Sequence, residues 1–331
     1  MEIAIQNALT EGIIRESARL YDTPFDTIKK IGGFENFVYE YEKKGENYIL
    51  RFVHSSHRSK EQVFAELEFI DFLDKNNARV STVIHSENDN LLEVIKINQD
   101  DYFIISVFVK APGEKIKLID LTNEFYEMFG EEVGKLHKLT KKYKPIHKRI
   151  DWDEELLLEK SRKLLGKNDR ILVEKYEKLV KKVQKLPKNI DNFGLIHTDL
   201  HFGNMHLYGG ELMFFDWDDA AYKHFISDIA IVIFYRFMNS KLSGDALDKE
   251  IALMLAPFFK GYLKQNSIDI SFLSNLNDFL MLRTIVLYVV IHMAGEELVD
   301  SPWGKQYIEK YRERIINETP YLTLEKVTEF L

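Results

Sequence analysis

Three oxygen-bearing side chains in the second half of the chain have a spacing that suits phosphate or metal chemistry. Asp199 and Asn204 lie in the segment His-Thr-Asp-Leu-His-Phe-Gly-Asn at residues 197–204, and Asp216 follows an apolar run after the Gly-Gly turn at 209–210. The pattern predicts strand, loop, strand, turn, strand and loop, so that one hairpin brings two polar loops side by side. Their oxygens suit a hard cation such as Mg²⁺, which keeps positions for phosphates and water. A carboxylate left free of the metal can orient a hydroxyl nucleophile.

This ordered pattern resembles the aminoglycoside phosphotransferase and choline kinase-like family, which are small-molecule kinases with the protein kinase fold. It continues with Asp228-Ile-Ala, which resembles the family's acid at the start of the next helix. The resemblance implies that Asp199 is the catalytic base or orients the acceptor hydroxyl. It implies that Asn204 and Asp216 hold Mg²⁺ on the phosphates of ATP, with GTP as the alternative donor. His197 would pack beneath the loop, and Asp228 would hydrogen-bond its backbone.

The first hundred residues are predicted to form a small antiparallel sheet with one inserted helix. An amphipathic helix is expected at residues 2–20 and a second helix at 59–76. The β-like runs are residues 25–31, 36–42, 48–53, 91–97 and 102–109.

One acid of the inserted helix is expected to be buried. On a helical wheel Glu66 falls in the middle of the apolar face, whereas Glu68 falls on the opposite, solvent-facing side. A carboxylate on an apolar face needs a cationic partner, and Arg51 in the third strand is the natural candidate. The family pairs a base of this strand with an acid of this helix, so Arg51 would bridge Glu66 and the phosphates. The alternative is an ordinary surface ion pair.

The remaining nucleotide contacts follow from the resemblance. Gly32-Gly33 stands where the phosphate loop is expected, although the segment 31–38 lacks the G-x-G-x-x-G pattern. A plain hairpin turn is the competing interpretation of two glycines between strands. The nucleotide base would lie at a hinge at residues 106–110, which includes Ser106 and Phe108.

The acceptor pocket of the family borders the loop after the metal-binding acid. Asp218 and Asp219 are therefore candidates for acceptor binding, with a solvated turn as the alternative. Tyr235 is a candidate aromatic wall for a cationic acceptor, and core packing is the alternative and more common role of such a side chain.

The predicted architecture is an α+β, two-lobed, protein kinase-like fold. Residues 1–108 would form a nucleotide-binding lobe, and residues 109–331 a mainly helical lobe with the catalytic loop and the acceptor site. Helices of this second lobe are expected at residues 118–139, 153–165, 169–186, 225–237, 246–264, 273–298 and 304–317.

Composition excludes several classes of protein. The chain has 331 residues, no cysteine, and 45 Lys+Arg against 53 Asp+Glu, a net charge of −8. The absence of cysteine excludes disulfide scaffolds, Cys-ligated zinc and thiol catalysis. Net acidity argues against a nucleic-acid partner. Because no uninterrupted apolar run reaches about 18 residues, a membrane span is not expected, and the cytoplasm is the predicted location.

Three alternatives to a small-molecule kinase stay open from the residues alone. A Ser/Thr protein kinase of the aminoglycoside-kinase-like type would use the same catalytic residues. A pseudokinase would bind nucleotide without turnover. A zinc hydrolase would need His197, Asp199 and His201 on one face of a strand, as their i, i+2, i+4 spacing allows.

Overall fold

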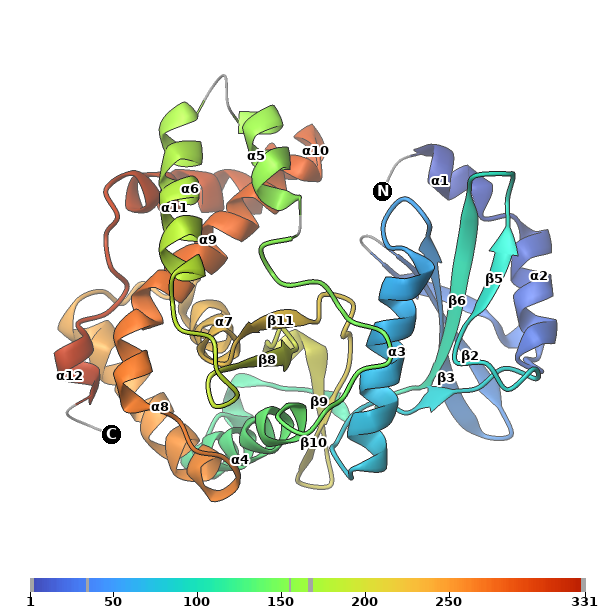
Figure 1. The fold of residues 1–331 in the computed structure, drawn as a ribbon, viewed down its shortest axis with the longest axis horizontal. Helices are drawn as coiled ribbons and strands as arrows, with labels where there is room; N and C mark the ends of the chain where they lie inside the picture. Colours follow the sequence, from blue (N-terminus) through green and yellow to red (C-terminus); the bar gives the residue numbers. More distant parts are fainter. Residues whose placement is uncertain (1–2, 34–35, 155, 166–168, 329–331) are drawn as a thin grey trace. The chain divides into compact units, whose positions relative to one another are not determined.

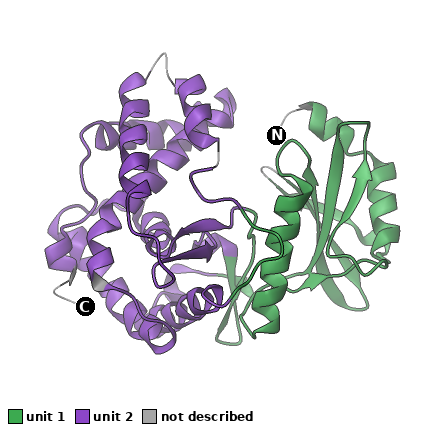
Figure 2. Cartoon of the chain, in the orientation of Figure 1, with its two compact units in different colours: residues 1–115, 143–149, 205–218 green, residues 116–142, 150–204, 219–331 purple. Residues whose placement is uncertain are grey.

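A computed structural model describes residues 3–33, 36–154, 156–165 and 169–328 of the chain. It contains two compact units, each built from segments that are distant in the sequence (Figure 2). Unit 1 comprises residues 1–115, 143–149 and 205–218, and unit 2 comprises residues 116–142, 150–204 and 219–331. The predicted lobe boundary at residue 108 falls inside a strand, and the division of the chain at that point stays a prediction.

Unit 1 contains an antiparallel sheet of six strands. The order is β1-β2-β3-β6-β4, and β5 also pairs with β6. Its elements are α1 (Ile3–Ala8), α2 (Glu11–Leu20), the 3-10 turn η1 (Phe25–Thr27), β1 (Lys29–Gly32), β2 (Phe37–Lys43), β3 (Glu46–His54), α3 (Lys60–Lys75), β4 (Val83–Ile84), β5 (Glu93–Lys96) and β6 (Tyr102–Val109).

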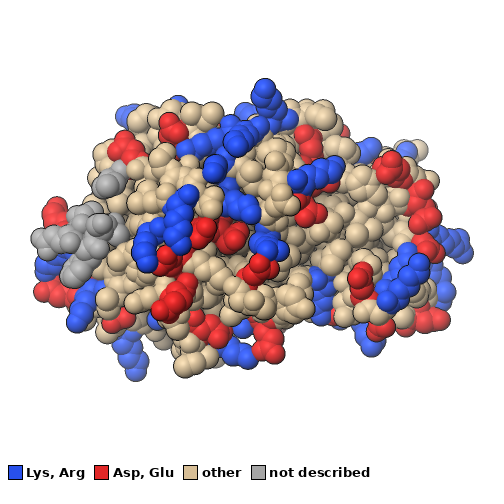
Figure 3. Space-filling view, turned by 90° about the horizontal axis from the view of Figure 1, so that it is seen from below, with Lys and Arg blue, Asp and Glu red and all other residues tan. Residues whose placement is uncertain are grey.

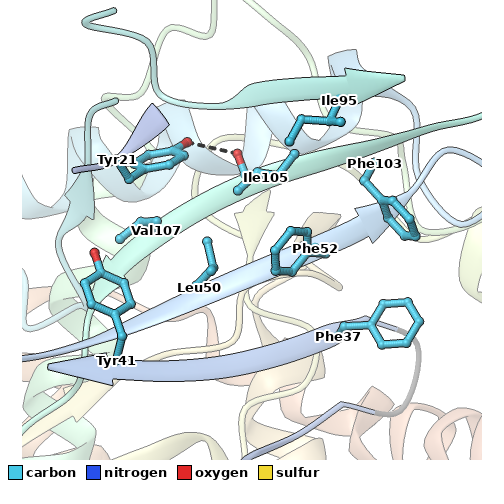
Figure 4. Close-up of a cluster of buried hydrophobic side chains, with 9 residues drawn as sticks. All are labelled: Tyr21, Phe37, Tyr41, Leu50, Phe52, Ile95, Phe103, Ile105 and Val107. Atoms are coloured by element: carbon cyan, nitrogen blue, oxygen red, sulfur yellow. Dashed lines mark hydrogen bonds between the residues drawn. The ribbon is translucent and has the colours of Figure 1, made fainter. Parts of the chain in front are cut away.

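Helix α2 covers one face of this sheet and helix α3 the other (Figure 1). Side chains along each strand alternate between the two faces. Leu50 and Phe52 of β3 belong to a buried cluster on the α2 side, where the hydroxyl of Tyr21 donates to the carbonyl of Ile105 (3.0 Å; Figure 4). Arg51, between these two residues, faces α3. One strand thus supplies apolar core on one side and a charged group on the other.

The first helix and strand differ from the sequence-based expectation. The helix expected at residues 2–20 is two helices, because Thr10 caps a new one: its Oγ1 accepts from the backbone N–H of Ile13 (3.4 Å). The strand expected from Phe25 begins at Lys29, since residues 25–27 form η1 directly after Pro24. The predicted helix at 59–76 is confirmed as α3, which is capped by Ser59.

A smaller sheet of unit 1 contains the predicted hairpin. Its order is β10-β9-β7, from β7 (Glu114–Lys115), β9 (Met205–Tyr208) and β10 (Glu211–Phe214). Gly209 and Gly210 have φ values of 59° and 83°. A two-residue turn with positive φ at both positions matches the twist of a hairpin, and glycine adopts it without a Cβ penalty.

Unit 2 is mainly helical. Its elements are η2 (Leu118–Asp120), α4 (Asn123–Thr140), α5 (Leu157–Leu165), α6 (Arg170–Gln184), β8 (Phe193–Ile196), η3 (Phe202–Asn204), β11 (Ala221–His224), α7 (Ile226–Phe237), α8 (Asp245–Gln265), η4 (Ile270–Asn275), α9 (Leu276–Met293), α10 (Glu296–Val299), α11 (Pro302–Ile316) and α12 (Leu324–Thr328). β8 pairs with β11 and not with the hairpin. Helices α4 and α8 approach closely at Gly130, which has no side chain. A Cβ at this position would lie 1.8 Å from the carbonyl oxygen of Phe258.

The helix expected at residues 273–298 is interrupted. Gly295, with φ of 95°, separates α9 from α10, and the start of the stretch is the 3-10 turn η4. In the described part of the chain, the stretch Ser271–Met293 alone is long and apolar enough to cross a membrane. The structure packs α9 against α7 and α11, so its apolar side chains form a helix core within unit 2.

Charged side chains of both signs are mixed on the face shown in Figure 3. This pattern differs from the basic stripe that is typical of nucleic-acid binding.

Candidate active site

Residues 197–204 form a loop that joins β8 to β9. The loop begins with His197, which is buried, and ends in the short 3-10 turn η3. The backbone N–H of Asp199 donates to Nδ1 of His197 (3.4 Å), which agrees with the predicted structural role of this histidine. Because β8 ends at Ile196, His197, Asp199 and His201 do not share a strand face, so the premise of the zinc hydrolase is wrong. The described residues contain no group of three or more His, Cys, Asp or Glu suited to a metal ion.

Asp228, at the start of α7, holds the backbone of this loop. Its carboxylate accepts hydrogen bonds from the backbone N–H of Thr198 (2.9 Å) and of His197 (3.3 Å), which is the contact that the resemblance implies. Nε2 of His137 lies 3.3 Å from the same carboxylate, and Nδ1 of His137 lies 2.9 Å from the hydroxyl of Tyr262. The loop is therefore anchored through α7 to helices α4 and α8.

Thr198 has a strained backbone conformation. Its φ is 60°, a region that a β-branched residue rarely adopts. Two hydrogen bonds retain it there: the backbone N–H bond to Asp228, and a bond from Oγ1 to the carbonyl of Asp219. Such strain costs about 1–3 kcal/mol and concentrates at functional sites. The geometry therefore indicates that the loop is held in a specific shape for the residue that follows, Asp199.

Three side chains contact the carboxylate of Asp199. Nδ2 of Asn204 donates to Oδ2 and also to the backbone carbonyl of Asp199, at 3.0 Å each. Nε2 of His201 lies 3.3 Å from Oδ2. Arg283 of α9 forms an ion pair with Oδ1, and the same guanidinium donates to the hydroxyl of Tyr235. Asp199 is thus fixed in one orientation by residues of three elements.

Arg283 keeps Asp199 ionised. Burial raises the pKa of this carboxyl, but the charge of Arg283 and the hydrogen bond with His201 outweigh it and lower the pKa to about 2. A carboxylate with so low a pKa is a weak base, but its negative charge makes it a strong hydrogen-bond acceptor. The arrangement therefore suits the orientation of a hydroxyl better than its deprotonation before attack.

Arg283 was not among the residues predicted from the sequence. A signal was present, because this cation interrupts the long apolar stretch of α9. Tyr235, predicted as an acceptor wall, instead contacts Arg283 and lies beside His201, with ring centroids 4.5 Å apart. Its predicted role in acceptor binding stays a prediction.

The amide of Asn204 is compatible with its predicted metal-binding role. Its N–H₂ group is committed to Asp199, which leaves Oδ1 as a ligand oxygen. One carboxylate and one amide oxygen, completed by phosphates and water, suffice for Mg²⁺. Asp216, the predicted carboxylate ligand, lies just after β10 in unit 1 with φ of 64°, another sparsely populated backbone conformation.

Unit 1 contains the predicted buried ion pair. Nη1 and Nη2 of Arg51 donate to the two carboxylate oxygens of Glu66 at 2.8 and 2.9 Å, and both side chains are at most 6% exposed. The alternative of a surface pair is wrong. A guanidinium carries five N–H donors, so donors of Arg51 remain for a phosphate.

Two residues of β6 that were predicted to bind the nucleotide base contact Arg51 of the neighbouring strand β3. Oγ of Ser106 accepts from Nε of Arg51 (3.3 Å), and the ring centroid of Phe108 lies 5.0 Å from its guanidinium. Because β6 runs to Val109, most of the expected hinge is strand. Contacts of Ser106 and Phe108 with a nucleotide base stay a prediction.

Asp218 lies in a buried charge cluster of unit 1. Its carboxylate contacts His57 (2.9 Å), Arg58 (3.6 Å) and Arg51 (3.9 Å). Burial raises its pKa, but the hydrogen bond with His57 and the charges of Arg58 and Arg51 lower it far more. The alternative of a solvated turn is therefore wrong for Asp218. Its role toward an acceptor stays a prediction, as does that of Asp219 in unit 2.

Glu68 does not face solvent as expected. Its carboxylate accepts from the backbone N–H groups of Ile146 (2.7 Å) and His147 (3.1 Å), because the segment 143–149 lies on this side of α3. The same segment places the buried Arg149 so that it donates to the carbonyl of Asp218.

The expected phosphate loop is described only in part. Gly32 ends β1, and a Cβ on Gly33 would lie 1.8 Å from the carbonyl oxygen of Asn36, so only glycine fits at position 33. Residues 34 and 35 of this loop lie outside the described residues. Phosphate binding by Gly32 and Gly33 stays a prediction.

Replacing Glu66 by glutamine is expected to destabilise unit 1. The change removes the charge of the carboxylate that accepts two hydrogen bonds from the buried Arg51 and leaves the more distant Asp218 (3.9 Å), which costs about 3 kcal/mol. We expect a lower thermal midpoint together with weaker Mg·ATP binding, measured by calorimetry. Glu61→Gln, at an exposed site in the first turn of the same helix, is the matched control. Equal behaviour of the two variants would contradict the role of the pair.

Comparisons with known proteins agree on one family. The sequence profile described as "Phosphotransferase enzyme family" matches residues 27–258. The amicoumacin kinase of Bacillus subtilis (strain 168) is 31% identical over 313 residues, which cover 94% of this chain and 93% of that protein.

Solved structures show the same architecture. Amicoumacin kinase hAmiN, in complex with AMP-PNP, Ca2+ and Ami, superposes with a TM-score of 0.92 at 28% identity, covering 99% of this chain and 100% of that one. A microcompartment-associated aminopropanol kinase superposes with a TM-score of 0.72 at 17% identity, covering 95% and 100%, a likeness of fold alone. The predicted kinase-like α+β fold is confirmed.

Proposed function

We propose that this chain, which belongs to the phosphotransferase enzyme family, transfers the γ-phosphoryl group of ATP to a hydroxyl of a small molecule. Two relatives, at 31% and 28% identity, are named as amicoumacin kinases, so amicoumacin is the first acceptor to test. The observation that carries the proposal is the fixed, ionised carboxylate of Asp199. It stands on a strained loop that Asp228 anchors.

In this mechanism Asp199 accepts a hydrogen bond from the acceptor hydroxyl. This hydrogen bond orients the hydroxyl oxygen toward the γ-phosphorus. Phosphoryl transfer passes through a loose transition state, in which the new O–P bond forms as the bond to the leaving ADP breaks. The hydroxyl proton becomes strongly acidic only as the new bond forms. A carboxylate with a pKa of about 2 can then accept it.

Other residues of the chain supply positive charge and metal ligands for the nucleotide. Arg51, held by Glu66, would contact the α- and β-phosphates with its remaining N–H donors. Asn204 and Asp216 would hold Mg²⁺, which neutralises the phosphate oxygens.

The decisive experiment is Mg·ATP-dependent release of ADP with a panel of acceptors. The panel contains amicoumacin, aminoglycosides, choline, homoserine and simple sugars, with the Asp199→Asn variant as the blank. We expect one class of acceptor to raise ADP release above the blank and to gain one phosphoryl group, detected by mass spectrometry. Mg·ATP binding without turnover of any small molecule, but with labelled phosphate on a protein, would refute the small-molecule acceptor.

A further inference from the structure

Unit 2 contains a cavity of about 600 Å³ between the end of α7, the segment that follows it, α8 and α11. This volume lies within the range of small-molecule sites. Six aromatic side chains contribute to its wall together with aliphatic ones, and the rings of Trp303 and Tyr307 lie next to each other with centroids 5.7 Å apart and planes inclined by 32°. The described residues that line it include three cations, Lys241, Lys310 and Arg314, but neither aspartate nor glutamate.

The positive charge of this cavity is not neutralised by carboxylates among the described residues. Nζ of Lys310 donates to the carbonyl of Met238 (2.6 Å), and Nη1 of Arg314 donates to the carbonyl of Pro320 (2.7 Å). Carbonyl oxygens satisfy donors but carry no net charge. Burial, and to a smaller extent the charge of Arg314, lowers the pKa of Lys310. Like charges on the wall of one cavity repel each other. An anion in the cavity would relieve this repulsion.

The cavity is separate from the carboxylate of Asp199, but one of its lining residues is hydrogen-bonded to the helix that carries Arg283. Asp199, Asn204 and Arg283 do not line it in the described structure. The hydroxyl of Tyr307 donates to the carbonyl of Thr284 (3.0 Å), the residue that follows Arg283 in α9. The cavity is therefore a distinct site whose wall supports the helix that holds Asp199.

We propose that this cavity binds a small amphipathic anion, with an aromatic or branched apolar body and a carboxylate or sulfonate group. The aromatic wall matches the body, and the three cations match the anionic group. A polycationic ligand of the aminoglycoside type would meet like charges here. The proposal concerns a binding site and does not depend on phosphoryl transfer.

The test uses two fluorescent probes that share one ring system. Anilinonaphthalene sulfonate carries the anionic group, and N-phenylnaphthylamine lacks it. We expect saturable binding of the sulfonate to the full chain, which Lys241→Glu and Lys310→Gln each weaken by about two- to fivefold. Binding of the neutral probe should change little. Lys249→Glu, at an exposed site on α8 outside the cavity, is the matched control.

Asp199→Asn separates this proposal from the proposed function. Binding of the sulfonate probe should persist in this variant, since the cavity does not contain Asp199. The proposal is overturned if the wild-type chain shows no saturable sulfonate binding, or if Asp199→Asn abolishes it. It is also overturned if Lys249→Glu weakens sulfonate binding as much as Lys241→Glu does, or if the cavity variants weaken both probes equally.

Discussion

Asp199→Asn is expected to lower kcat by at least about 10²-fold while Mg·ATP binds nearly as well as to the wild-type chain. The amide keeps the shape of the carboxylate but loses its charge. It can no longer hold the acceptor hydroxyl as strongly or accept its proton. Asn204, and not Asp199, is the proposed metal ligand of this loop, so nucleotide affinity should be retained.

The experiment measures ADP release and Mg·ATP binding on the same preparations. Because the Asp199→Asn change removes the charged partner of Arg283, the thermal midpoint is recorded as well. Asp245→Asn is the matched control, since Asp245 is an exposed acid at the start of α8. Turnover of Asp199→Asn equal to that of the control would remove Asp199 from the mechanism. A parallel loss of Mg·ATP binding would instead assign Asp199 to the nucleotide.

Features encoded by local sequence could be predicted. Glu66 lies on the apolar face of one helix, and Arg51 is the cation of the neighbouring strand, so a helical wheel identifies the buried pair. Gly209-Gly210 between two short strands specifies a tight hairpin. The contacts of Asp228 with the loop followed from the resemblance to a family, because no local pattern connects residues that are 30 positions apart.

Features created by tertiary packing could not be predicted. Glu68 faces solvent on an isolated helix, but the irregular segment 143–149, which has no periodicity to read, covers it. Asp218 and His57 are 161 residues apart, and Arg283 and Asp199 are 84 residues apart. In each case the sequence contains a charged residue whose partner only the fold identifies. A cation within an apolar helix is the one signal that could have prompted a search for a buried acid.

Arg283→Met is expected to move the acid limb of the activity profile toward neutral pH. In the wild-type chain the charge of Arg283 and the hydrogen bond with His201 outweigh burial and hold the pKa of Asp199 at about 2, so Asp199 stays ionised down to about that pH. Without that charge, burial continues to raise the pKa of Asp199, and the hydrogen bond with His201 and the charges of His201 and His197 remain to oppose it. An opposite charge at this range is worth about 1–3 pKa units. Protonation of Asp199 should then abolish turnover at a correspondingly higher pH.

Stability gives a second readout with a defined sign. Because the pKa of Asp199 is lowered by folding, the ion pair stabilises the chain fully above the unfolded pKa of 3.8 and loses this contribution as the pH falls toward 2. The wild-type chain should therefore exceed Arg283→Met in stability at neutral pH, and the difference should shrink in acid.

Two control variants separate charge from shape. Arg283→Lys keeps the positive charge, so we expect its acid limb to stay near that of the wild type. Tyr235→Phe removes only the hydroxyl that accepts from Arg283 and should likewise leave the limb in place. The measurement is kcat/KM for ADP release across the acidic to neutral range. If Arg283→Met and Tyr235→Phe gave the same profile, Arg283 would serve as a packing group, and the low pKa of Asp199 would need another source.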